Sequence, residues 1–230
     1  MEAIILAGGF GTRLQNAIKG IPKPMATINN NPFLDYVFYY LKNNGITNVI
    51  LSVYYKSDVI RQYYNSAYNG IKITYSNDKA PLGTGGAIRA ALSKSTNTNV
   101  FVINGDTYFE IDFYRLMEKH TKNNNDITLS LKPMSNFNRY GFVKTKIDGK
   151  IIAFEEKEYQ KYGEIDGGVY LIKNNIFEMN EDIENFQFSD FIKNNLNSLN
   201  IGSVSFDKLF IDIGTPEDLA KASEILKYNL

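Results

Sequence analysis

The sequence contains no cysteine and only one histidine, His120. Without cysteine the chain can form no disulfide, no thiolate metal site and no thiol nucleophile, a composition typical of a reducing compartment. A single histidine excludes metal sites built from several imidazoles, and a Ser-His-Asp triad would have to use His120. Because residues 115–120 have the character of an exposed helix end, we expect a structural role for this side chain.

Net charge and long apolar runs are lacking as well. The 25 basic residues balance the 25 acidic ones, so no broad positive field exists and no nucleic-acid partner is expected. The first apolar stretch, residues 3–6, is far too short for a signal-peptide core or a membrane span. We therefore expect a cytoplasmic protein without membrane insertion. An oligomer is possible, but no pattern in the sequence indicates one.

Short apolar runs alternate with amphipathic stretches through the first half of the 230 residues. Runs at 3–6, 48–53, 71–75 and 100–103 predict strands, and the intervening segments predict helices, as in a parallel α/β sheet. After about residue 126 the pattern changes, since Asp148-Gly149 predicts a hairpin between 141–147 and 150–154. Further strands are expected at 166–172 and 210–213. One α/β domain with a mixed, mainly parallel sheet follows.

Two helix starts are marked by capping residues. Asn31 is expected to cap a helix that has Pro32 in its first turn, and Thr215 to cap one that begins with Pro216 and carries acids in its first turn.

A glycine-rich segment, residues 7–14, directly follows the first strand. Such a turn can bring backbone N–H groups against phosphate oxygens, although a purely structural turn is the alternative interpretation. The segment is not a Walker A loop, because no Gly-Lys-Ser/Thr ending is present. It is not a dinucleotide fingerprint either, because Leu14 stands where the last glycine is required.

A lysine held between prolines follows in the segment Pro22-Lys23-Pro24. The prolines restrict the backbone around it, so Lys23 is expected to have a fixed position. Together with Arg13 it could neutralise a triphosphate and the charge that develops as pyrophosphate leaves.

The block from Leu6 through Arg13 to Pro22-Lys23-Pro24-Met25 resembles the opening motif of the sugar-1-phosphate nucleotidyltransferases, and the resemblance extends along nearly the whole chain. It implies a three-layer, Rossmann-like (GT-A-like) fold. Residues 1–125 would bind the nucleoside triphosphate and residues 126–230 the sugar 1-phosphate. The implied nucleotide-binding residues are Leu6, Ala7, Gly8, Gly9, Gly11, Thr12, Gly83, Thr84 and Gly85.

The same resemblance implies a Mg²⁺ cofactor and three catalytic residues, Arg13, Lys23 and Asp106. Asp106 follows the apolar strand at 100–103 and matches a family metal ligand, and Asp212 matches the second. Ligands in open α/β sheets gather at strand carboxyl ends, and Mg²⁺ prefers oxygen ligands. A helix cap or a salt bridge is the alternative role for either acid alone.

The resemblance also implies that Gly141, Glu156, Lys157, Asp166 and Gly168 bind the sugar phosphate. The chain departs from many relatives in two places, with Glu158 where they have proline and with Asp166 where they have asparagine. These departures leave a structural role open for Glu156 and Asp166.

Within this family the chain is most similar to the D-glycero-α-D-manno-heptose 1-phosphate guanylyltransferases, on its short length and on the segments 82–87, 139–141 and 211–218. That likeness implies GTP as donor and a GDP-heptose for surface polysaccharide as product. A cytidylyl- or uridylyltransferase for another hexose 1-phosphate is the first alternative. A nucleotide-binding relative without turnover is the second.

Overall fold

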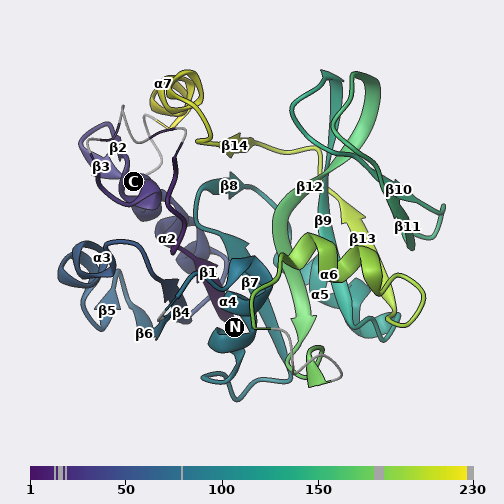
Figure 1. The fold of residues 1–230 in the computed structure, drawn as a ribbon, viewed down its shortest axis with the longest axis horizontal. Coiled ribbons are helices and arrows are strands. Elements are labelled where there is room, and N and C mark those ends of the chain that lie inside the picture. Colours follow the sequence, from purple (N-terminus) through teal and green to yellow (C-terminus); the bar gives the residue numbers. More distant parts are fainter. Residues whose placement is uncertain (13, 15–17, 19, 79, 179–183, 227–230) are drawn as a thin grey trace.

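A computed structural model describes residues 1–12, 14, 18, 20–78, 80–178 and 184–226. Its centre is an eight-stranded sheet in the order β13-β9-β12-β7-β1-β4-β6-β5 (Figure 1). The strands of this sheet are β1 (Glu2–Leu6), β4 (Asn48–Val53), β5 (Ala67–Tyr68), β6 (Ile71–Asn77), β7 (Asn99–Asn104), β9 (Ile127–Phe137), β12 (Gln160–Lys173) and β13 (Ile201–Ser205).

The sheet is mixed, as the sequence predicts. β7, β1, β4 and β6 run parallel to one another, and β9 and β13 are also parallel to each other. β12 is antiparallel to both β7 and β9, so it joins the two parallel parts. The predicted strands at 3–6, 48–53, 71–75, 100–103 and 166–172 are confirmed, and β12 is longer than expected.

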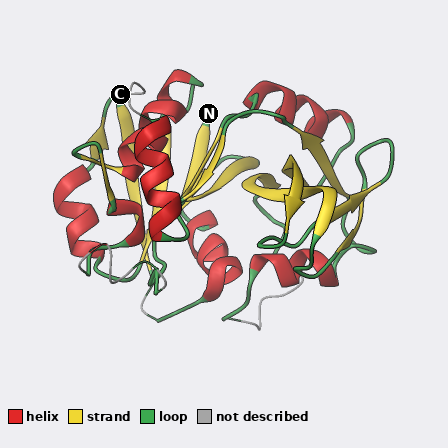
Figure 2. Ribbon diagram, turned by 90° about the horizontal axis from the view of Figure 1, so that it is seen from above, coloured by secondary structure: helices red, strands yellow, loops and turns green. Residues whose placement is uncertain are grey.

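Helices cover both faces of the sheet and make the predicted three layers (Figure 2). α2, α3 and α5 belong to the apolar core on one face, whereas α4 and α6 belong to the core on the other. The described helices are α2 (Phe33–Asn43), α3 (Ser57–Tyr64), α4 (Gly83–Leu92), α5 (Phe113–Lys122), α6 (Phe188–Asn194), α7 (Pro216–Ile225) and the short 3₁₀ helix η1 (Lys23–Met25).

Side chains alternate between the two faces along the central strands, and this alternation explains why the sheet has an apolar core on each face. In β1, Ala3 and Ile5 join the core under α2, whereas Ile4 joins the core under α4. Successive side chains of a strand point to opposite faces, so a run of apolar residues is buried on both sides. The continuous apolar runs of the sequence therefore become the centre of the sheet.

Three small sheets complete the fold. β10 (Val143–Thr145) and β11 (Ile151–Phe154) form the hairpin predicted from Asp148-Gly149, and β2 (Thr27–Ile28) pairs with β3 (Asn31–Pro32). β8 (Thr107–Phe109) pairs with β14 (Phe210–Asp212), with Asp212 opposite Thr107. This last pair places the segment that begins at Asp106 beside the segment that begins at Phe210.

One predicted helix cap is confirmed and the other is wrong. Thr215 accepts a hydrogen bond from the backbone N–H of Asp218, whose carboxylate accepts one from the backbone N–H of Thr215. Asn31 does not cap α2, because its backbone pairs with Ile28 and its amide donates to Asn29 O. α2 instead begins after Pro32.

His120 is buried, with 1% of its surface exposed, and not at an exposed helix end as expected. It lies on the inner face of α5, where Nδ1 is 2.9 Å from Thr128 Oγ1 and Nε2 is 3.2 Å from Asn99 Oδ1. Burial and the nearby Lys173 lower the pKa of His120 to about 4, so it is neutral at physiological pH. Its role is structural.

Among the described residues, no helix is both long and apolar enough to cross a membrane.

Candidate active site

The carboxyl ends of β6, β4, β1 and β7 share one edge of the sheet, because these strands are parallel. A cavity of about 480 Å³ lies along that edge. Strand order reverses here, since β4 and β7 lie on opposite sides of β1, and such a switch point is where open α/β sheets bind ligands. The described lining residues are Leu6, Gly8, Gly9, Phe10, Lys23, Pro24, Ser52, Tyr54, Asp78, Pro81, Leu82, Gly83, Thr84, Ala87, Asn104, Asp106, Asn185 and Gln187.

The glycine loop and Lys23 are in direct contact, as their shared motif implies. Gly11 has φ +59°, and a Cβ on it would lie 2.8 Å from Lys23 Cβ. Lys23 starts the 3₁₀ helix η1, in which Met25 N–H donates to Pro22 O at 2.8 Å. The loop therefore packs on the stem of a lysine whose backbone is fixed.

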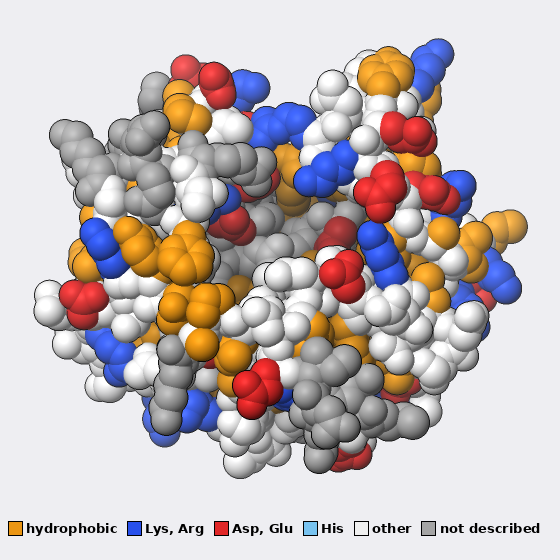
Figure 3. All heavy atoms as spheres, in the orientation of Figure 1, with side chains coloured by type: hydrophobic (Ala, Val, Ile, Leu, Met, Phe, Trp, Pro, Cys, Tyr) orange, Lys and Arg blue, Asp and Glu red, His pale blue; other side chains and the backbone are white. Residues whose placement is uncertain are grey.

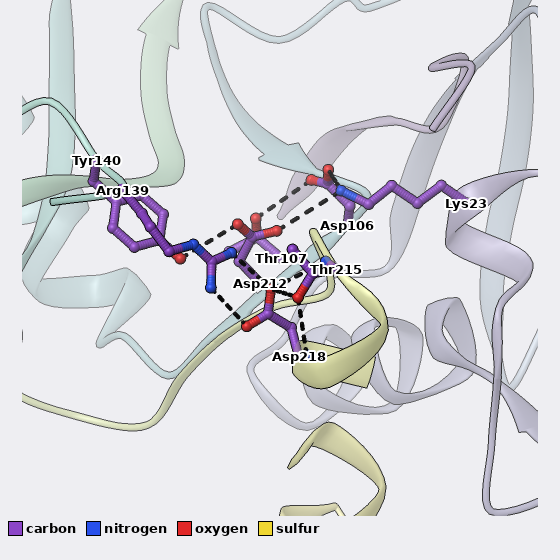
Figure 4. Close-up of polar contacts among 8 residues, drawn as sticks. All are labelled: Lys23, Asp106, Thr107, Arg139, Tyr140, Asp212, Thr215 and Asp218. Carbon is purple, nitrogen blue, oxygen red and sulfur yellow. Dashed lines mark hydrogen bonds and ion pairs between the residues drawn. The ribbon is translucent and has the colours of Figure 1, made fainter. Parts of the chain in front are cut away.

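Lys23, Asp106 and Asp212 form one charged centre (Figure 4). Lys23 Nζ lies 2.5 Å from Asp106 Oδ2 and 3.8 Å from Asp212 Oδ1. Burial, then the neighbouring Asp106, raises the pKa of Asp212, while Lys23 opposes this rise. Two carboxylates this close repel each other, so the pair attracts cations. The surface around this part of the molecule is hollowed and carries charges of both signs (Figure 3).

The segment around residue 140 supports Asp212 from the other side. Tyr140 Oη donates to Asp212 Oδ2 at 3.4 Å, and Arg139 binds Asp218 with both terminal nitrogens, at 3.0 and 2.7 Å (Figure 4). The Arg139 guanidinium lowers the pKa of Asp218. The sequence did not predict these contacts, because they join residues that are distant along the chain.

The acid pair fits a hard divalent cation. Among the described residues no group of three or more candidate ligands surrounds a single point. Mg²⁺ commonly takes one or two carboxylates and completes its shell with water and substrate phosphates, so Asp106, which lines the cavity, and Asp212, which also lies near Lys23 Nζ, are a suitable donor set.

The start of α4 contributes less to the cavity than its glycines imply. Gly83 and Thr84 line it, but a Cβ on Gly85 would overlap the ring of Phe186, and one on Gly86 would overlap Glu184 O. Gly85 N–H donates to Phe186 O at 2.9 Å. Gly85 therefore permits close packing against Phe186, and its implied role in nucleotide binding stays a prediction.

The other predicted nucleotide-binding residues also include some that line the cavity and some that do not. Leu6, Gly8 and Gly9 line the cavity, whereas Ala7 is buried beneath it and Gly11 and Thr12 are not among the described lining residues. Arg13 lies outside the described residues.

The predicted sugar-phosphate residues are not all brought together. Asp166 Oδ1 accepts from Gly168 N–H at 2.9 Å, and Gly168, with φ +71°, packs against the Asn104 amide at the cavity. Gly141 lies against Glu155 O. Glu156 and Lys157 are exposed and do not line the cavity, and Glu156 lies 3.8 Å from Lys193 Nζ.

Sequence reasoning missed several lining residues, among them Ser52, Asp78, Asn185 and Gln187. Asp78 directly follows β6, which extends two residues beyond the strand predicted at 71–75. Burial raises the pKa of its carboxyl to about 6. Asn185 and Gln187 come from a segment that the sequence does not relate to the first half of the chain.

Comparison with known proteins agrees with this geometry. The family model described as nucleotidyl transferase matches residues 2–228. The chain is 47% identical to the D-glycero-alpha-D-manno-heptose 1-phosphate guanylyltransferase of Aneurinibacillus thermoaerophilus, over 99% of both chains. It is 49% identical to the enzyme of that name from Campylobacter jejuni, over 95% of this chain and 96% of the other.

A crystal structure of HddC from Yersinia pseudotuberculosis superposes with a TM-score of 0.88 at 35% identity, covering 98% of this chain and 99% of that one. The same protein complexed with GMP-PN superposes with a TM-score of 0.87 at 34% identity, with the same coverage. This chain belongs to the nucleotidyl transferase family.

Proposed function

We propose that the protein transfers GMP from GTP to D-glycero-α-D-manno-heptose 1-phosphate, releasing pyrophosphate and forming GDP-heptose. The observation that carries this proposal is that Lys23 and Asp106, which both line the cavity of about 480 Å³, form one charged centre with Asp212. The nearly full-length relatives at 47% and 49% identity support the choice of guanylyl donor and heptose acceptor.

The cavity provides separate places for the parts of GTP. Gly8 and Gly9 offer backbone groups without side chains at the end of β1, where phosphate oxygens can approach closely. Lys23 lies beside this loop with a cationic Nζ that a triphosphate would draw away from Asp106. Leu82, Gly83 and Thr84 form a wall further along the sheet edge.

Asp106 and Asp212 would hold Mg²⁺ in this proposal. When bound, the cation supplies positive charge that brings the two anionic substrates together and polarises the α-phosphorus. Lys23 neutralises negative charge that grows as pyrophosphate leaves. The chain needs no general base, because a sugar phosphate is already ionised near neutral pH.

For the acceptor, we propose the side of the site formed by Gly141, Glu156, Lys157, Asp166 and Gly168. Gly168 is adjacent to Asn104 and so to the end of β7, and its backbone N–H donates to Asp166 Oδ1. Lys157 is exposed on the loop between β11 and β12, where its ammonium is accessible to a phosphate.

A panel of substrates tests the proposal. Pyrophosphate release is measured with Mg²⁺, each of the four nucleoside triphosphates and each of heptose, mannose and glucose 1-phosphate. We expect GTP to be used at least about tenfold better than CTP or UTP in kcat/KM, a difference of about 1.4 kcal/mol that one or two base-edge hydrogen bonds supply. We also expect the heptose phosphate to outcompete glucose 1-phosphate.

The alternatives give different results in the same panel. A preference for CTP or UTP would reject guanylyl transfer but keep nucleotidyl transfer. No pyrophosphate with any pair, together with binding of a triphosphate, would identify a nucleotide-binding protein without turnover.

A further inference from the structure

Arg139 and Asp218 form an ion pair close to Asp212, and neither residue belongs to the described lining of the cavity (Figure 4). The guanidinium of Arg139 donates to both carboxylate oxygens of Asp218, at 3.0 and 2.7 Å. The Arg139 side chain is 46% exposed. An ion pair in such contact with water contributes little to stability, whereas two parallel bonds restrict the relative orientation of the two groups. The pair is therefore suited to holding two segments in a fixed relation.

One of these segments carries the second carboxylate of the charged centre. Asp212 ends β14, and Thr215 caps the helix α7 that follows. Asp218 Oδ2 accepts from Thr215 N–H at 3.0 Å, in the same carboxylate that pairs with the guanidinium. At the other end of this turn, Ile213 N–H donates to Asp106 O at 3.1 Å. The turn between β14 and α7 is thus held at both ends.

The other segment is the loop between β9 and β10, in which Tyr140 follows Arg139. Tyr140 Oη donates to Asp212 Oδ2 at 3.4 Å, and its ring centroid lies 6.1 Å from that of Phe210 on β14. The guanidinium carbon of Arg139 lies 5.8 Å from the centroid of the Tyr140 ring. Tyr140 therefore lies between β14 and the ion pair and contacts both.

The same loop continues into the proposed acceptor side. A Cβ on Gly141 would lie 2.6 Å from Glu155 O, and Glu155 N–H donates to Phe142 O at 2.8 Å. Glu156 and Lys157 directly follow in the chain. The loop thus contacts β14 through one residue and the acceptor side through the next, so a shift of the loop would alter both.

We propose that Arg139 and Asp218 are positioning residues, whose ion pair fixes the loop between β9 and β10 against the start of α7. The fixed loop orients Asp212 towards Mg²⁺ and Gly141 towards the sugar phosphate, so one contact aligns the metal ligand with the acceptor. This inference rests on the proposed function and names residues outside the cavity on which its geometry depends.

Binding of Mn²⁺ alone tests the orientation of Asp212 without turnover. The electron paramagnetic resonance signal of free Mn²⁺ is followed in titrations of the wild type, Arg139→Gln and Asp218→Asn. The second change keeps an oxygen that can accept from Thr215 N–H but removes the charge that pairs with Arg139. We expect both variants to bind Mn²⁺ about tenfold more weakly than the wild type, because the two carboxylates are no longer held in one arrangement.

Steady-state kinetics tests the acceptor side. In pyrophosphate release with GTP, both variants should raise the KM for heptose 1-phosphate by about tenfold, and the Mg²⁺ concentration at half-maximal rate by a similar factor. GTP binding in the presence of EDTA should change less than about twofold, because neither residue lines the cavity. The double variant should be no worse than the more affected single variant, since both changes break the same ion pair.

Asp207→Asn is the matched control, because Asp207 forms an exposed ion pair with Lys132, at 2.6 Å, and does not line the cavity. It should keep the wild-type affinity for Mn²⁺ and the wild-type KM. Thermal melting establishes that all variants are folded.

Wild-type Mn²⁺ affinity and wild-type acceptor KM in both folded variants would overturn the inference, even if their melting temperatures fell, and would leave guanylyl transfer standing. If the wild type releases no pyrophosphate with any substrate pair, the proposed function fails. The Mn²⁺ titrations then decide by themselves whether the ion pair orients Asp212.

Discussion

Lys23 lies near both carboxylates of the charged centre, those of Asp106 and Asp212. It reaches Asp106 and Asp212 from η1 and is nearly buried, with 11% of its side chain exposed. Without substrates its single positive charge faces two carboxylates, so the centre carries an excess of negative charge. In the proposed function, a cation would bind the two carboxylates and the phosphates of GTP would bind Lys23.

Asp106→Asn and Asp212→Asn should each remove most turnover, by about a hundredfold or more, because an amide is a much poorer ligand for Mg²⁺ than a carboxylate of the same shape. The fold should survive both changes. Asp212→Asn should even keep its melting temperature, since it relieves repulsion from Asp106. Pyrophosphate release at saturating Mg²⁺ and thermal melting are the measurements. A variant with a near wild-type rate would show that its aspartate is no metal ligand.

His120 should make stability depend on pH. Its pKa is about 4 in the folded protein against an ordinary 6.5, so the unfolded chain binds more protons between these values. The free energy of unfolding should therefore fall as pH decreases from 6.5 towards 4, by up to about 3 kcal/mol from this residue. Urea unfolding across that range measures the loss. His120→Gln should show a smaller loss, and an equal loss in both proteins would contradict the assignment.

At the scale of elements, the start of α4 is shaped by the segment before α6. Gly83, Gly85 and Gly86 each lie where a Cβ would meet backbone or ring atoms of residues 184–186. Thr84 Oγ1 accepts from Phe188 N–H at 2.9 Å, which ties the same two segments together. The glycines thus permit a close approach that forms one wall of the cavity.

Gly85→Val should destabilise the protein, by about 1–3 kcal/mol or more, because the new side chain would overlap Phe186. GTP use would fall only as a consequence of that distortion. Gly9→Ala is the contrast, since a Cβ there meets nothing within 4 Å. Urea unfolding compares the two. If Gly85→Val keeps wild-type stability yet loses GTP use, Gly85 faces the base after all.

Local patterns in the sequence were sufficient to predict helices and strands, but they did not predict the contacts between these elements. The strand at 48–53 and the cap at Thr215 depend on neighbouring residues, and both are confirmed. The packing of Gly85 and the burial of His120 were not predicted, because their partners, Phe186 and Thr128, lie on other elements. Asp78 was missed because a single acid after a strand looks like any polar loop residue.

At the scale of the whole molecule, one sheet runs through both halves of the chain. β12, from the second half, pairs with β7 from the first. The implied boundary near residue 125 therefore does not separate two independently folded units, because a chain ending there would expose the apolar edge of β7.

Unfolding should accordingly be a single cooperative transition. Far-UV circular dichroism and tyrosine fluorescence should give coincident urea curves for the whole chain. A fragment of residues 1–125 should fail to fold or should aggregate, because β7 would lack its neighbour on one side. Separate transitions, or a soluble and folded fragment, would show that the first half is a domain by itself.

The pairing of β8 with β14 has a consequence for the order in which the protein is made. A ribosome synthesises Lys23 and Asp106 long before Asp212, and domains begin folding from the amino terminus as they emerge. A nascent chain that has reached only β9 contains Lys23 and Asp106, but it lacks β12, the antiparallel neighbour of β7, and it lacks Asp212. The charged centre is complete only after β14 has joined β8, so in the proposed function chemical competence arrives when nearly the whole chain has been made.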